Sequence, residues 1–163
     1  MSGAQYRLLR DLTDEGDWAA ANLEAAVAGI VRDRFEMAHA LIGAAQALAK
    51  SNVPMVRRSA VSRAYYGAYQ AARATYLSVS RQDEDDHERL GKGIDSLKGL
   101  PGFGAEMLKE LRRLRNEFDY SPYPGPNPRA LYEEREIEAI IKKSIREAKQ
   151  LVRAFGRFLR ERG

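Results

Sequence analysis

The chain has 163 residues, of which 44% are hydrophobic and 31% are charged, and its formal net charge is +4. This length and composition predict one folded domain with a hydrophobic core, and a charge that permits contact with nucleic acid without establishing it. The sequence has no Cys and no apolar run long enough to span a bilayer, so thiol catalysis and thiolate metal sites are excluded and we expect a cytoplasmic protein that does not enter a membrane.

The first half of the chain has helical periodicity. Apolar residues recur every three or four positions from about Asp17 to Lys50, which predicts one long helix or two helices bent near Arg32. A proline lacks the N–H that would continue a helix, so Pro54 separates this element from the next one. The second helix is predicted to run from about Pro54 to Val79.

The second half predicts three more helices. A charged loop at 81–86 leads into a short helix from about His87 to Leu97, and a longer helix follows from about Phe103 to Asp119. Four of the six prolines lie in 121–128, so this segment is expected to be an irregular connection. The last helix is expected from about Ala130 to Arg160.

These elements predict an all-α fold. No segment shows the short β-branched runs bounded by turn residues that are typical of strands. The short connections favour antiparallel neighbours, so we expect a single-domain antiparallel bundle of about five helices. Residues 1–32 are interpreted as an N-terminal helical extension and residues 33–163 as the bundle.

The second predicted helix carries an unusual stripe of polar and aromatic side chains on one face. The stripe consists of Ser62, Tyr66, Tyr69, Arg73 and Tyr76. A glycine in mid-helix costs about 1 kcal/mol relative to alanine, so Gly67 indicates a close approach of another backbone. The stripe is open to two interpretations, which are packing or subunit contact on the one hand and the wall of a cleft on the other.

The fourth predicted helix ends in a second polar group. Arg112, Arg115 and Asp119 share one face, and Arg115 and Asp119 lie one turn apart, so these two side chains are able to pair. Asn116 and Tyr120 extend the group towards the end of the helix. Spacing alone is equally compatible with an ion pair that only stabilises the helix and with a functional site.

Taken together, the two polar segments resemble a known family. Residues 62–73, SRAYYGAYQAAR, are similar to the second-helix signature of prokaryotic HEPN domains, and residues 115–120, RNEFDY, are similar to a later helix of that family. His87 also resembles a recurrent family position. The resemblance covers roughly residues 35–159.

The resemblance implies a HEPN-like homodimer with a cleft between its subunits, and a place in a prokaryotic toxin–antitoxin or related defence system. Many HEPN proteins are endoribonucleases that work without a metal or other cofactor, and their genes often lie beside that of a minimal nucleotidyltransferase. RNA or a nucleotide is the implied ligand. The residues implied as catalytic are Arg115, Asn116, Asp119 and Tyr120, and those implied as supporting the cleft are Ser62, Arg63 and Tyr66.

One position departs from the ribonuclease pattern of the family. That pattern is Arg, a polar residue, a few further residues and then His, and here Tyr120 stands where His is expected. A tyrosine with an ordinary pKa of about 10 is a poor base near neutral pH. Three functions therefore stay open, which are RNA binding with or without cleavage, a non-catalytic module that binds a nucleotide or docks a nucleotidyltransferase, and a structural dimerisation bundle.

The last predicted helix has a basic stripe of its own. Its members are Lys142, Arg146, Lys149, Arg153, Arg157 and Arg160. Such a stripe is compatible with contact to a phosphate backbone and equally with a solvated helix face. Neither His39 nor His87 belongs to a metal-ligand motif of recognised spacing, and we expect no metal site.

Overall fold

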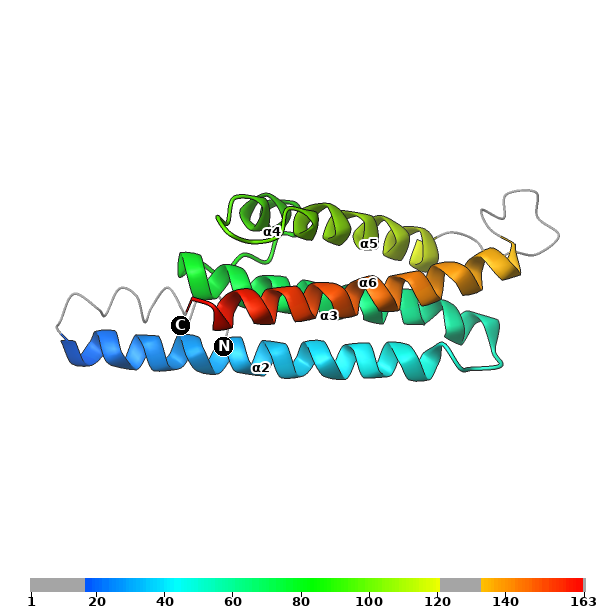
Figure 1. Cartoon of the computed structure of the whole chain (residues 1–163). Coiled ribbons are helices and arrows are strands. Elements are labelled where there is room, and N and C mark those ends of the chain that lie inside the picture. The colour runs from blue at the N-terminus through cyan, green and yellow to red at the C-terminus, as the bar shows by residue number, and fades with distance from the viewer. Residues whose placement is uncertain (1–16, 121–132, 163) are drawn as a thin grey trace.

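The computed structural model describes residues 17–120 and 133–162, and in these ranges it is an all-α bundle with no strand (Figure 1). The fold class is thus as the sequence predicts. The five helices are α2 (Asp17–Leu48), α3 (Pro54–Ser80), α4 (His87–Asp95), α5 (Phe103–Tyr120) and α6 (Glu134–Arg160). The first of them is one continuous helix, which decides between the two alternatives near Arg32.

Helix α3 is the centre of the bundle, because α2, α4, α5 and α6 all pack against it. In Figure 1, α2 and α6 run alongside α3, while α4 and α5 lie together above them. The face of α3 that meets its neighbours is made of small residues. Its fully buried alanines are Ala60, Ala64, Ala68, Ala71, Ala72 and Ala74. These short side chains let helix axes approach closely, since little volume separates the two backbones.

Helix α2 approaches α3 closely at Gly67, as the sequence predicts. A Cβ atom placed on Gly67 would lie 2.9 Å from Cγ1 of Ile42 and 3.0 Å from the carbonyl oxygen of Ala38, both in α2. Backbone atoms have little freedom to move aside. The missing side chain of Gly67 is therefore a requirement of the contact between α2 and α3.

The connection from α3 to α4 is anchored at several points. Arg81 closes α3 with a left-handed backbone (φ 57°) and an N–H that donates to the carbonyl of Leu77. Further on, the carboxylate of Asp86 caps α4 by accepting from the backbone N–H groups of Glu88 (2.9 Å) and Arg89 (2.8 Å). Such a cap typically contributes about 1 kcal/mol. The start of the short helix α4 is thus well defined.

Asp83 ties this same connection to the long helices. Its two carboxylate oxygens accept from Arg34 of α2 and Arg73 of α3, each at 2.7 Å, and its side chain is only 6% exposed. Burial by itself would raise the pKa of Asp83, but the two guanidinium groups outweigh it and lower that pKa below its ordinary value. The loop before α4 is therefore held by a buried charge cluster.

Some expectations fall outside the described residues. These are the proline-rich connection at 121–128, the start of the last helix at Ala130, and the first half of the proposed extension at 1–32. The division at residue 32 stays a prediction. None of the helices within 17–120 and 133–162 has the length and apolar character needed to cross a membrane.

We predict that Gly67→Ala lowers the free energy of unfolding by about 1 to 2 kcal/mol, because overpacking against the Ala38 carbonyl exceeds the gain in helix propensity. Gly43→Ala is the matched control in α2, where a new Cβ would meet nothing within 4 Å. That variant should be more stable than the parent by about 0.5 to 1 kcal/mol. Urea unfolding followed by circular dichroism measures both, and equal effects of the two substitutions would contradict the close-contact account.

Candidate functional site

Arg115 lies at the centre of a polar cluster between α5 and α3. Its Nε is 2.9 Å from a carboxylate oxygen of Asp119, one turn further along α5. Its two terminal nitrogens donate to Oδ1 of Asn116 and to the hydroxyl of Tyr66 in α3, each at 2.9 Å. The guanidinium is thus held by one ion pair and two hydrogen bonds. Three partners in three directions fix the orientation of a long side chain that would otherwise be mobile.

The cluster is completed by Ser62 and Tyr120. The hydroxyl of Ser62 in α3 donates to Asp119 at 3.2 Å. The guanidinium carbon of Arg115 lies 5.3 Å from the ring centroids of both Tyr66 and Tyr120, so the cation is flanked by two aromatic rings. Tyr120 is 74% exposed. One side of the cluster therefore opens to solvent.

Six of the seven residues predicted for the site come together in this way, and we refer to them as the Arg115 cluster. Its members are Ser62, Tyr66, Arg115, Asn116, Asp119 and Tyr120. Arg63 is different. It is exposed on α3, and no hydrogen bond or ion pair joins it to another residue of the described ranges. Nothing in the geometry gives Arg63 a place beside Arg115.

A neighbouring aromatic group brings His87 close to the cluster. The hydroxyl of Tyr65, a buried residue next to Tyr66 in α3, is hydrogen-bonded to Nδ1 of His87 at the start of α4 (2.5 Å). The His87 ring lies 4.4 Å from that of Tyr69, measured between centroids, and the Tyr69 hydroxyl donates to the carbonyl of Asp85 at 2.7 Å. The other ring nitrogen of His87, Nε2, has no hydrogen-bond partner among the described residues.

The surroundings of His87 are positively charged. Burial lowers its pKa below the ordinary value, and the nearby charges of Arg112 and Arg115 lower it further. The imidazole is therefore neutral at pH 7. Burial also raises the pKa of the Tyr65 phenol, so this hydroxyl stays protonated at neutral pH.

His87 and Arg112 line a shared cavity between α4 and α5. Its volume is about 610 Å³, and its wall includes the cations Lys92 and Lys109 and the acids Glu88, Asp95 and Glu106. Arg112 makes no direct ion pair with an acidic residue of the described ranges, although Asp86 and Glu88 lie within its electrostatic range. A guanidinium beside a neutral imidazole is suited to bind a phosphate and to exchange a proton with it.

The place of His87 was not predictable from spacing. It lies 28 positions before Arg115 in the chain, and only the fold brings it to the same side of α3. The helical pattern predicted that Arg112 shares a face with Arg115. Its position beside His87 is visible only in the structure.

Comparison with known proteins gave no match to a family model, to a curated protein or to a solved structure. Within 17–120 and 133–162, no group of three or more His, Asp or Glu side chains could hold a metal ion. The site is therefore described by its own geometry, as a cluster of Arg, Tyr and His side chains over α3.

We predict that the stability of the protein falls between about pH 6.5 and pH 5 because of His87. Above pH 6.5 the imidazole is neutral in both folded and unfolded chains and contributes no pH dependence. Below it the unfolded chain binds the proton more readily, since the folded pKa is lowered, so acid favours unfolding. Thermal melts at pH 7.5 and pH 5.5 should show a smaller loss in His87→Gln than in the parent. His39→Gln, at an exposed position of α2, should behave as the parent does, and an unchanged loss in His87→Gln would contradict the assignment.

Proposed function

We propose that the chain is a HEPN-like component of a prokaryotic toxin–antitoxin or related defence system, and that it binds RNA through the Arg115 cluster. One observation carries the proposal. The two segments that resemble HEPN motifs, far apart in the sequence, are joined by hydrogen bonds from Arg115 to Tyr66 and from Ser62 to Asp119. This contact between the two resembling segments supports the proposal of one shared site.

The chemistry of the cluster suits a phosphodiester. Guanidinium groups bind phosphate oxygens through pairs of hydrogen bonds, and aromatic rings stack on unpaired bases. Arg115 already pairs with Asp119, so a phosphate that binds Arg115 replaces this ion pair with a new one. Arg112, which makes no direct ion pair within the described ranges, is a second guanidinium on the same face of α5 and interacts with Asp86 and Glu88 only over a longer distance. Tyr120, exposed at the rim, provides a surface for stacking.

The proposed assembly is a homodimer. The open side of the cluster carries Asn116 and Tyr120, both exposed at the end of α5. A second copy facing this side would place two Arg115 clusters along one cleft. A minimal nucleotidyltransferase remains the proposed partner from the resemblance.

Metal-independent cleavage is a second candidate function, and the position of His87 favours it. In such a reaction the 2′-oxygen attacks phosphorus, a base takes the 2′-proton, and an acid protonates the departing 5′-oxygen. His87 is neutral and is oriented by Tyr65 through Nδ1, and in the tautomer whose Nδ1–H donates to the Tyr65 hydroxyl its Nε2 is a free acceptor. It could supply the proton acceptor that Tyr120 does not. Arg112 and Arg115 would stabilise the charge that develops on phosphorus.

We predict that Arg115→Ala weakens RNA binding at least tenfold, because the loss of a bidentate phosphate ligand removes about 1.5 to 3 kcal/mol. Binding is measured with fluorescently labelled total tRNA at fixed salt. Arg113→Ala is the matched control, because Arg113 lies on α5 and pairs with Glu110 and Glu117 instead. Equal affinities of the Arg115 variant and the parent, with thermal stability lowered, would leave Arg115 a structural role and refute the proposal.

We predict that cleavage, where it occurs, persists in EDTA and is reduced at least a hundredfold by His87→Gln. The assay follows the parent chain and the variant on the same RNA by gel electrophoresis. His39→Gln is the control, since it removes the other histidine of the chain. Absence of cleavage by the parent, or undiminished cleavage by His87→Gln, removes the catalytic candidate and leaves binding as the function.

A further inference from the structure

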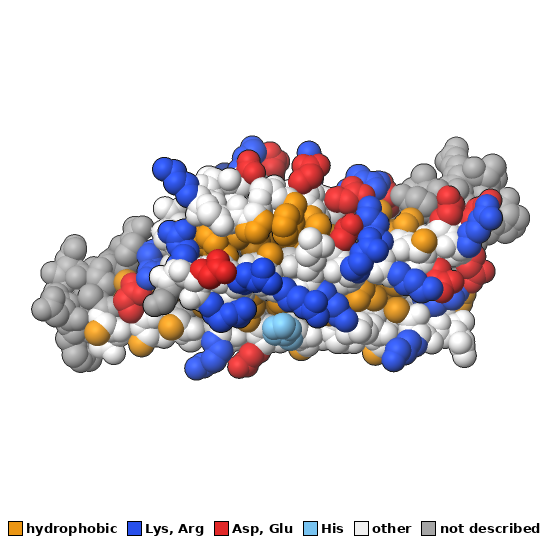
Figure 2. Space-filling model, in the orientation of Figure 1, with side chains coloured by type: hydrophobic (Ala, Val, Ile, Leu, Met, Phe, Trp, Pro, Cys, Tyr) orange, Lys and Arg blue, Asp and Glu red, His pale blue; other side chains and the backbone are white. Residues whose placement is uncertain are grey.

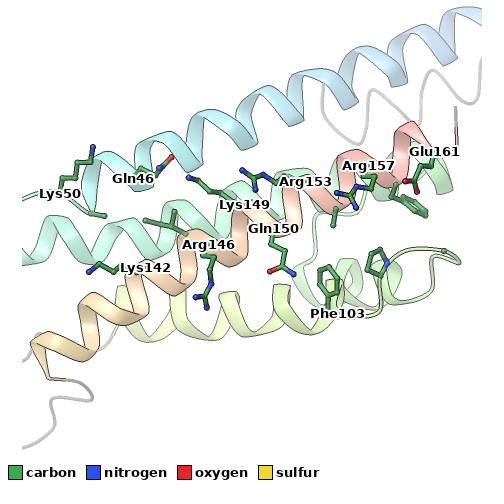
Figure 3. Close-up of a pocket in the computed structure, with 16 residues that line it drawn as sticks. Gln46, Lys50, Phe103, Lys142, Arg146, Lys149, Gln150, Arg153, Arg157 and Glu161 are labelled. Carbon is green, nitrogen blue, oxygen red and sulfur yellow. The ribbon is translucent and has the colours of Figure 1, made fainter.

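A second, larger cavity lies along α6, away from the Arg115 cluster. Its volume is about 1060 Å³. Helix α6 forms its floor, the end of α2 forms one wall, and the connection between α4 and α5 forms the other (Figure 3). No member of the Arg115 cluster lines it. We refer to this cavity as the α6 groove.

The lining of the groove is strongly basic. Its cations are Lys50, Lys142, Arg146, Lys149, Arg153 and Arg157, and the only acidic residue that lines it is Glu161. Figure 2 shows the corresponding band of Lys and Arg side chains across this face of the molecule. Six cations against one carboxylate produce a local positive potential far above that expected from the net charge of the chain.

Most of these cations form no ion pair with the residues that the structure describes. Lys142 pairs with Glu138 at 2.7 Å. Arg146, Lys149, Arg153 and Arg157 form no ion pair with any acidic residue in 17–120 or 133–162. Lys143 of α6 is paired with Glu110 and Glu147, and Arg135 is paired with Glu133. Arg160 has no ion pair within the described ranges and does not line the groove. Four of the five unpaired cations of α6 in these ranges therefore line the groove.

The spacing of the unpaired cations follows the helix. They lie three, four and four residues apart and form a single row. At 1.5 Å per residue, the row from residue 146 to residue 157 is about 16 Å long. A row of this length can contact several successive phosphates of one strand, which a single small anion cannot do.

The wall opposite the basic row carries an aromatic ring. Phe103, at the start of α5, is 39% exposed, which is unusual for a phenylalanine. Figure 3 shows Phe103 on the α5 side, with Gln150 of α6 between that wall and the basic row. An exposed ring facing a cationic track matches the arrangement by which proteins hold an unpaired strand, with phosphates on cations and bases stacked on rings.

We propose that the α6 groove binds single-stranded nucleic acid, with its phosphates along Arg146, Lys149, Arg153 and Arg157 and a base on Phe103. A duplex fits the features less well, because its paired bases are stacked on one another and cannot reach Phe103. A lipid surface also fits less well, since the apolar face of α6 is buried in the core and has nothing to insert into a bilayer. The inference does not depend on the role of Arg115.

The test uses the full chain and two labelled probes of about ten nucleotides, oligouridylate and oligodeoxythymidylate, titrated by fluorescence anisotropy at several salt concentrations. We expect the logarithm of the affinity to fall with the logarithm of salt concentration with a slope near −3, as for four phosphate contacts on a single strand. The double variant R146Q/R153Q should bind at least tenfold more weakly, with a slope reduced by about 1.4. Phe103→Ala should lose roughly 5-fold to 100-fold in affinity with an unchanged slope.

The control is R113Q/R135Q, which removes two exposed arginines outside the groove, and it should bind as the parent does. Equal loss in this control and in R146Q/R153Q would overturn the proposal, as would the absence of salt-dependent binding by the parent. Tighter binding of a duplex of the same length would also overturn it. So would groove variants that weaken binding of an acidic protein and leave the affinity for both nucleic-acid probes unchanged.

Loss of nucleic-acid binding in Arg115→Ala alone would leave the Arg115 cluster as the nucleic-acid site and refute the groove. Loss in the groove variants alone would support the groove as the site. A preference for one probe over the other would support the proposal and identify the sugar.

Discussion

The close contact between α2 and α3 is the constraint on which the other features depend. The carbonyl of Ala38 and the side chain of Ile42 occupy the space above Gly67, so the backbones of α2 and α3 come close together there. Because one face of α3 packs against α2, the side chains on the opposite face of α3 meet α5 and α4. Ser62, Tyr65, Tyr66 and Tyr69 all lie there, and every one of them makes a hydrogen bond to another element.

This arrangement explains why the candidate site is polar at its rim and aromatic at its base. The alanine face of α3 contributes packing without bulk, while the tyrosine face contributes both apolar area and hydroxyl groups. Tyr65 is almost completely buried and still satisfies its hydroxyl through His87. On α5, the backbone carbonyl oxygen of Phe118 accepts a hydrogen bond from the buried side chain of Arg58 at 3.1 Å. The end of α5 is thereby fastened to α3 just beside Asp119.

Local patterns in the sequence were enough to predict the helices and part of the site. Helical spacing placed Arg115 with Asp119, and the mid-helix position of Gly67 indicated a close approach, because both depend on neighbours within one turn or on an intrinsic cost. The partnership of Tyr65 with His87 was beyond such reasoning, since it depends on how the loop containing Asp83 returns to α2. The role predicted for Arg63 stays a prediction. This residue belongs to the motif by sequence, but the helix turns it towards solvent.

The anchoring of that loop makes the position of α4 depend on the packing of the long helices. Helix α4 has nine residues, and a helix this short is not stable alone in water. Its position is set from one side by Asp83, which accepts hydrogen bonds from both Arg34 of α2 and Arg73 of α3. Local opening of α4 would therefore move His87 away from Arg115.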